Sequence, residues 1–322
     1  MEPIRLQVEQ PCGDLLEFLA VALPSLTLNQ LRRLIAHGAV EVDGRRVDHL
    51  HVPQPREAVA LFLPETPIVE YRPEKMDVEV LYEDAGILAV NKPAGLNVIP
   101  EPNTLDARFL NGLLYYVQNE SSSPCERIHV VHRLDKETSG VLLVAKNVVA
   151  ARYLSERFEH REVTKHYLAL VRGEVAGDEG EVDLPIAQGT RGRLRLRERR
   201  GRPAQSRYRV VERFRDLTLV EVQPLTGRQH QVRLHMSGIG HPLAVDPLYG
   251  GRPALLLSEI KLGYRAKEGR PEPPLMDRLT LHARRIEVKL ADGNPLVAEA
   301  PLPADFDRLL RTLRKYAGKG RR

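Results

Sequence analysis

At 322 residues the chain is longer than a typical single domain, which predicts one large core with a smaller module beside it. Hydrophobic residues make up 42% of the sequence, enough for a packed interior, so a disordered chain is excluded except at its ends. Lysine and arginine number 48 against 43 acidic residues, and the modest net charge of +5 is clustered rather than spread.

The basic residues gather at 191–202, which holds seven arginines and one glutamate, and at the C-terminal 314–322. A guanidinium donates two parallel hydrogen bonds to phosphate oxygens, and its charge releases the counterions condensed on a nucleic acid. Both segments therefore fit contact with phosphate, although a solvated loop and a solubilising tail would explain them equally well.

Cysteine usage and hydropathy indicate the compartment. Cys12 and Cys125 are far apart and lack metal-ligand spacing, which favours a reducing compartment without disulfides. The first residues contain no apolar signal-peptide core, and no apolar stretch approaches the roughly 18 residues of a membrane span. We expect a cytoplasmic protein without a membrane segment.

Residues 1–65 are predicted to form a small α+β unit. Apolar residues at helical spacing predict helices over 13–23 and 27–38. The Asp43-Gly44 pair between short alternating runs then predicts a hairpin.

The second predicted helix is basic on its outer side. It is expected to begin after Thr27 and to stop at Gly38, with Arg32 and Arg33 off its apolar stripe. The order of helix, basic helix and hairpin resembles an S4 domain, a small RNA-binding module, which implies that these two arginines contact RNA. A small structural cap with incidental arginines is the alternative.

A proline-bearing stretch follows, and we predict a linker at 66–76 and a larger domain with a basic tail at 77–322. In the larger domain, two strands flank the turn at 82–86, and helices are predicted over 104–118, capped by Thr104, and over 148–158. Strands are predicted at 141–145, 165–175, 180–187, 206–214, 217–225, 228–236 and 279–290, and a loop insertion at 252–278. Many strands with few helices between them predict an α+β fold with a mixed, mostly antiparallel sheet flanked by helices.

The stretch "HRLDKETSG", 132–140, precedes the apolar strand predicted at 141–145. In an extended segment Arg133 and Asp135 share a face, which places the carboxylate near the core boundary. Such a carboxylate costs several kcal/mol unless a cation or hydrogen bonds compensate it. Candidate cations are Arg133, Lys136 and the distant Arg228, and a salt-bridged structural aspartate is the alternative to a catalytic one.

A second polar stretch lies at 226–250, and it carries Arg228, His230, Gln231, Arg233, His235 and His241. Alternation along the predicted strand places donors on both of its sides, which suits a polar ligand. His230 and His235 would face opposite sides, so we expect histidines that form hydrogen bonds or pack, and no metal site.

Several motifs occur in a fixed order after "VNKPAGL": "HRLDKETSGVLLVAK", "TKHYLALVRG", "TGRQHQVRLH", "GHPLAVDPLYG" and "LTLHA". Together they resemble the RluA-type pseudouridine synthases over residues 77–300. The resemblance implies that a uridine in RNA is detached from its ribose, turned and rejoined through carbon. This isomerisation needs no cofactor or metal, in agreement with the lack of a P-loop, dinucleotide fingerprint or metal motif.

The resemblance also implies roles for single residues. Asp135 matches the essential aspartate, which acts on the ribose or the base. Tyr167 matches a tyrosine packed beside the base and able to accept the C5 proton. Arg228 matches the arginine that pairs with the aspartate and holds it ionised and aimed.

Further residues are implied in RNA contact. Arg133 matches a side chain that occupies the space left by a flipped nucleotide, which offsets part of the cost of extrusion. Lys92, Lys165 and Arg233 are further candidates. One departure from the family is Ile99 before Pro100, where many relatives have a histidine, and it weakens a role for that loop in RNA contact.

The expected partner is ribosomal RNA of the large subunit, with transfer RNA as an alternative, and the enzyme is expected to be monomeric. One competing hypothesis is an RNA-binding ribosome-assembly factor that has lost turnover. Another is a ribonuclease with two histidines and a lysine, which would shorten the RNA.

Overall fold

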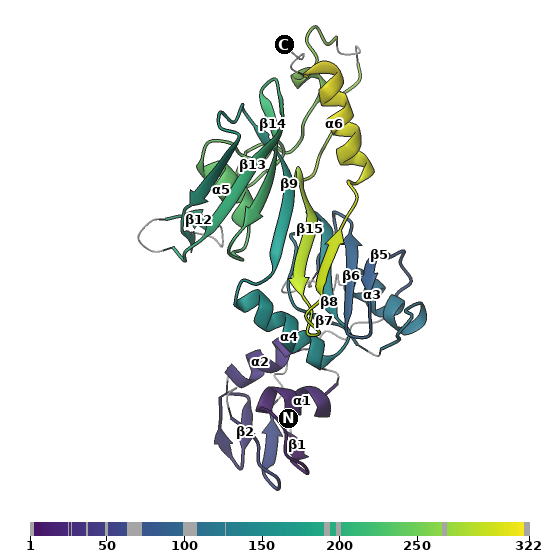
Figure 1. Ribbon diagram of the computed structural model, residues 1–322, viewed down its shortest axis with the longest axis vertical. Coiled ribbons are helices and arrows are strands. Elements are labelled where there is room, and N and C mark those ends of the chain that lie inside the picture. The colour runs from purple at the N-terminus through teal and green to yellow at the C-terminus, as the bar shows by residue number, and fades with distance from the viewer. Residues whose placement is uncertain are drawn as a thin grey trace.

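The structure is a computed structural model that describes residues 3–24, 26, 28–36, 38–48, 51–62, 73–98, 108–125, 127–189, 194–197, 201–265 and 269–318. These residues form a four-stranded sheet near the N-terminus, a ten-stranded sheet and a two-stranded hairpin. Figure 1 shows the N-terminal unit at one end of the molecule, beside α4, and α6 near the opposite end.

The N-terminal unit combines the sheet order β1-β4-β2-β3 with two helices. Its elements are β1 Ile4–Gln7, α1 Leu15–Ala22, α2 Leu28–Ala36, β2 Val40–Val42, β3 Arg45–Arg46 and β4 Ala58–Leu61. Asp14 caps α1 by accepting a hydrogen bond from the Glu17 amide at 2.8 Å. Asp43 and Gly44 both have positive φ, 47° and 74°, which is the geometry of a tight hairpin turn between β2 and β3. The predicted hairpin is confirmed, whereas Thr27 lies outside the described residues.

The large sheet has the order β10-β13-β14-β9-β15-β8-β6-β5, with β16 and β7 paired to β15 and β8. The elements of this part of the chain are β5 Glu79–Glu83, β6 Ile87–Lys92, α3 Arg108–Asn119, β7 His129–Val130, β8 Ser139–Ala145, α4 Val148–Glu159, β9 Thr164–Arg172, β10 Glu179–Asp183, β11 Ile186–Gln188, β12 Leu194–Leu196, β13 Gln205–Phe214, β14 Leu217–Pro224, α5 Gln231–Gly238, β15 Leu281–Lys289, β16 Pro295–Glu299 and α6 Ala304–Tyr316. Among the described strands β15 and β8 form the one parallel pair. The predicted mixed, mostly antiparallel α+β fold is confirmed.

The central strand β8 is buried along its whole length, because both faces of the sheet are covered there. On one face, α3 packs its buried Phe109, Leu113 and Val117 against β6 and β8. On the other face, Leu154 of α4 joins a core that also contains residues of α1 and α2. This shared core attaches the N-terminal unit to the larger one, and Arg152 of α4 adds contacts to Asp14 at 3.6 Å and Glu17 at 3.5 Å.

Two regions differ from the sequence prediction. The predicted strand 228–236 is wrong, because the helix α5 occupies Gln231–Gly238 and packs Val232 and Met236 against β14 and β9. The basic tail expected from 314 begins inside α6, whose buried Phe306 and Leu313 cover the far end of the sheet. No helix of the described residues is long and apolar enough to cross a membrane.

Candidate active site

The turn before β8 places Asp135 at the edge of the core. A turn covers Lys136 and Glu137, and the Thr138 amide donates to the Asp135 carbonyl at 3.0 Å. Gly140 has φ +117°, and a Cβ there would lie 2.1 Å from the Ala283 carbonyl oxygen. Only glycine allows this close approach of β8 and β15. The sequence expectation of a carboxylate just before a buried strand is therefore met.

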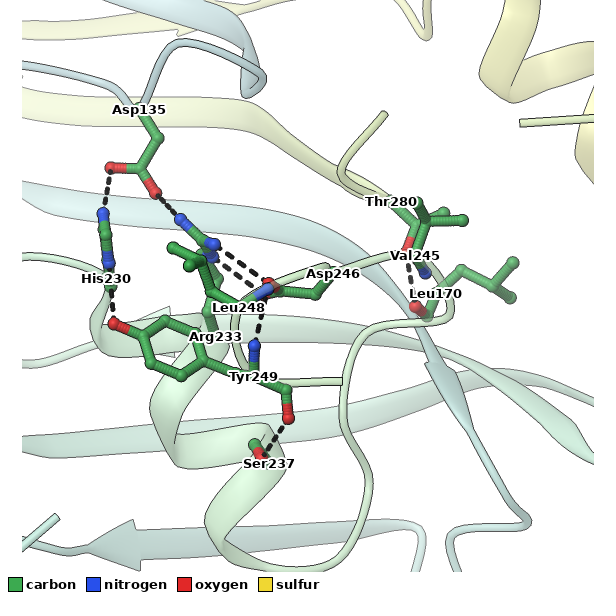
Figure 2. Close-up of polar contacts among 10 residues, drawn as sticks. All are labelled: Asp135, Leu170, His230, Arg233, Ser237, Val245, Asp246, Leu248, Tyr249 and Thr280. Atoms are coloured by element: carbon green, nitrogen blue, oxygen red, sulfur yellow. Dashed lines mark hydrogen bonds and ion pairs between the residues drawn. The ribbon is translucent and has the colours of Figure 1, made fainter. Parts of the chain in front are cut away.

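Arg233 of α5 joins two carboxylates, as Figure 2 shows. Its Nε and Nη2 donate to the two oxygens of Asp246 at 2.8 and 2.9 Å, and its Nη1 donates to Asp135 Oδ2 at 3.0 Å. The Asp246 side chain is 1% exposed and also accepts from the Leu248 and Tyr249 amides. Such a bidentate pair fixes the guanidinium plane, so Asp246 orients Arg233 and Arg233 orients Asp135.

His230 faces the second oxygen of Asp135. Its Nε2 lies 3.7 Å from Asp135 Oδ1, and its Nδ1 lies 2.8 Å from the Tyr249 hydroxyl (Figure 2). Burial lowers the pKa of His230, with the negative charge of Asp135 acting in the opposite direction. If the Tyr249 hydroxyl donates to Nδ1, a neutral His230 carries its hydrogen on Nε2, the atom that faces the carboxylate.

Asp135 lines a cavity of about 390 Å³, which we call the Asp135 cavity. Its lining includes five other predicted site residues: Arg133, Lys165, Tyr167, Arg228 and Arg233. Burial, and then the charge of Asp135, raise the pKa of Tyr167, while burial lowers the pKa of Lys165. The Tyr167 phenol therefore stays neutral at pH 7. Arg133 is an exposed cation in the lining of the same cavity.

The pairing expected for Arg228 is wrong. Its Nε donates to the Pro203 carbonyl at 3.1 Å, and among the described residues the arginine that pairs with Asp135 is Arg233. The reason is the missed helix: Arg228 precedes α5, whereas Arg233 lies within it. Helical spacing of His230 and Arg233, three residues apart, would have placed both on one face toward Asp135. Arg228 still lines the Asp135 cavity.

Asp246 and Tyr249 were not among the predicted site residues. The signal available was a carboxylate at the end of the apolar run 243–245, where burial requires a cation. That cation is Arg233, predicted as a contact for RNA, which is buried with 5% exposure. Its geometry makes it a positioning residue for Asp135.

The RNA contact predicted for Lys92 is also wrong, because this side chain is 0% exposed. Its Nζ donates to the carbonyls of Pro93, Leu96 and Lys136 at 2.7, 2.8 and 3.1 Å. The Lys92 side chain thus ties the loop after β6 to the residue that follows Asp135. The buried lysine therefore supports the turn that carries Asp135.

Replacing Lys92 by methionine is expected to lower the free energy of unfolding by about 1–3 kcal/mol, because the three hydrogen bonds donated by this buried side chain are lost. The variant should also turn over more slowly, since the turn at Lys136 loses its anchor. Urea unfolding and initial rates test both effects. Lys289→Met, at an exposed position of β15, is the matched control. Equal unfolding midpoints for the two variants would show that the hydrogen bonds of Lys92 do not stabilise the protein.

The predicted contacts of the N-terminal unit lie on α2. Arg32 is exposed there, which leaves it accessible to a ligand. Arg33 also belongs to α2, but its side chain lies outside the described residues. Neither role is tested by the geometry, and both stay predictions.

Comparison with known proteins adds an independent finding. The model of the RNA pseudouridylate synthase family matches residues 86–238, and the S4 domain model matches residues 15–52. The chain is 35% identical over 309 residues to a Bacillus subtilis protein named uncharacterized RNA pseudouridine synthase YlyB, covering 95% of this chain and 96% of that one. It is 36% identical to ribosomal large subunit pseudouridine synthase D of Xanthomonas campestris, covering 94% and 89%. The solved structure of human RNA pseudouridylate synthase domain containing 4 matches with a TM-score of 0.56 and 26% identity, covering 73% of this chain and 93% of that one.

Proposed function

Because the chain belongs to the family of RNA pseudouridine synthases, which are isomerases, we propose that it converts specific uridines of large-subunit ribosomal RNA to pseudouridine through Asp135. The observation that carries the proposal is the Asp135 carboxylate, held by Arg233 in the lining of the Asp135 cavity. The names of several relatives, ribosomal large subunit pseudouridine synthase D, support the choice of RNA. Transfer RNA is the alternative substrate.

The reaction needs one group to act at the sugar or the base and another to move a proton. The N1–C1′ bond breaks, the C5–C1′ bond forms, C5 loses its proton and N1 gains one, so the atoms balance without a co-reactant. Asp135 supplies the carboxylate, with Oδ2 bound to Arg233 and Oδ1 turned toward His230. This fixed orientation leaves the carboxylate little freedom to turn away from a bound nucleotide.

Tyr167 is proposed as the residue beside the base that handles the C5 proton. Its pKa is raised, so it enters the reaction as a neutral phenol. Accepting the C5 proton then requires it to pass on its own hydroxyl proton. Asp135, whose charge contributes to the raised pKa, is the candidate acceptor.

A base that is stacked within an RNA helix cannot reach a cavity of this kind. The target nucleotide therefore has to leave its stack, at a cost of a few kcal/mol. Arg133 is exposed at the wall of the Asp135 cavity, where its guanidinium can fill the vacated space in the RNA. We extend the proposal to a monomeric, cytoplasmic enzyme that acts without a metal. Because the isomerisation is redox-neutral, the proposed reaction needs no redox cofactor.

Mapping pseudouridines in cells with and without this chain tests the proposal. We expect at least one pseudouridine of large-subunit ribosomal RNA to vanish on deletion, and to return with the wild-type gene but not with Asp135→Asn. If every ribosomal site persists and a transfer RNA site vanishes, the substrate is transfer RNA. If no site vanishes, the proposed enzyme function is wrong, and the alternative of a ribosome-assembly factor without turnover is favoured.

A further inference from the structure

A second cavity lies next to the Asp135 cavity, and we call it the arginine cavity. It measures about 500 Å³ and is lined by the β11–β12 hairpin together with Arg197, Arg202 and Arg228. Arg228 and Gln229 line both cavities. A ligand long enough to occupy both cavities would therefore pass Arg228 and Gln229.

The three guanidiniums come from two segments of the chain, the connection between β12 and β13 and the connection between β14 and α5. Arg197 follows β12, Arg202 precedes β13, and Arg228 precedes α5. Burial lowers the pKa of Arg228, and the charges of Arg202 and Arg161 lower it further. The fold thus gathers cations whose mutual repulsion an anion would relieve.

Other surface arginines of the fold pair with carboxylates. Arg207, Arg213 and Arg314 lie 2.7, 2.7 and 2.8 Å from carboxylates of Glu181, Asp178 and Glu212.

Within the described part of the chain, by contrast, no carboxylate pairs with Arg197, Arg202 or Arg228. The hydrogen bond from Arg228 Nε to the Pro203 carbonyl fixes the guanidinium without neutralising it. The arginine cavity therefore presents three cations to a ligand, and the described part of the chain supplies no carboxylate to neutralise them.

We propose that the arginine cavity binds a backbone phosphate of the same RNA strand, close to the uridine that enters the Asp135 cavity. This inference rests on the proposed function and gives it a second anchoring point. A flipped nucleotide remains joined to its neighbours through phosphodiesters, and guanidinium forks bind phosphate oxygens in pairs. The amides of Gln188 and Gln229, in the lining of the cavity, suit sugar hydroxyls beside that phosphate.

The phosphate contact holds the strand while the base is out of its stack. Because it is made before and during the reaction alike, its loss should raise KM and leave kcat at saturating RNA nearly unchanged. Loss of the contact should also lower the salt dependence of binding, since about 0.7 counterions are released per phosphate neutralised on a single strand.

The test compares the double variant Arg197→Gln, Arg202→Gln with the control Arg311→Gln. Arg311 lies on α6 at another end of the fold and is 77% exposed, beside Asp307. Initial rates of tritium release are measured on large-subunit ribosomal RNA transcribed with [5-³H]uridine. Binding of a ten-nucleotide oligouridylate is measured across salt concentrations, and unfolding midpoints check that both variants fold.

We expect the double variant to raise KM about tenfold, which is the loss of one charge-assisted contact of at least about 1.4 kcal/mol, and to reduce the salt slope by about 0.7. The control should match the wild type in both quantities. A double variant that matches the control in KM and in salt slope overturns the phosphate subsite. If the wild type releases no tritium, the proposed function fails, and the salt slope alone then decides the subsite.

Discussion

Replacing Asp135 by asparagine is expected to abolish isomerisation while leaving the protein folded. The amide oxygen of asparagine can still accept the hydrogen bond from Arg233 Nη1, which is 3.0 Å long in the native site. It lacks the negative charge that a nucleophile or base at this position needs. We expect turnover to fall at least about a hundredfold, because general acid–base groups contribute two to four orders of magnitude.

The control for this variant is Asp216→Asn. Asp216 is exposed and has φ +59°, a conformation that asparagine tolerates, so the same chemical change is made where no site is present. The free energies of unfolding of the two variants should differ by less than about 3 kcal/mol, the upper value for a hydrogen bond between charged groups, so both variants stay folded. An Asp135→Asn enzyme that converts its RNA fully would sink the catalytic role of the carboxylate.

Replacing Arg233 by methionine is expected to reduce both stability and turnover. Asp246 is 1% exposed and would lose both of its bonds to the guanidinium, so a buried charge would be left unpaired. Breaking such a pair from one side costs about 3–5 kcal/mol. Asp135 would also lose the contact that aims it, which we expect to cost about a hundredfold in turnover.

A second variant separates the two effects of Arg233. In Arg233→Met with Asp246→Asn, the unpaired charge is gone, so much of the lost stability should return. Turnover should stay low, because nothing then holds Asp135 Oδ2. Recovery of turnover together with stability would show that Arg233 serves folding alone.

The fold and the entrance of the site follow from local patterns. The hairpin at Asp43-Gly44 and the buried strand after "HRLDKETSG" depend on turn chemistry and on an apolar run, which neighbouring residues decide. Asp135 therefore lies where its spacing predicts. Arg133, Lys165 and Tyr167 reach the same cavity, in agreement with the motifs that singled them out.

The partners of Asp135 depend on tertiary packing instead. The segment "QVRLHM" alternates polar and apolar residues like a strand, yet it forms a two-turn helix because Val232 and Met236 pack onto the sheet. This difference exchanges Arg228 for Arg233 as the ion-pair partner. Lys92 shows the same limit, since a buried lysine that donates to three backbone carbonyls cannot be told from an exposed lysine by composition.

The central claim is that Asp135 catalyses the exchange of a C5–H bond for a C5–C1′ bond in RNA. Its most direct test is the release of tritium by the purified protein from large-subunit ribosomal RNA labelled at uridine C5, with RNA length followed in parallel. The account predicts one tritium released per pseudouridine formed, no release by Asp135→Asn, and RNA of unchanged length. Absence of release from both ribosomal and transfer RNA, or shortened RNA, would contradict it.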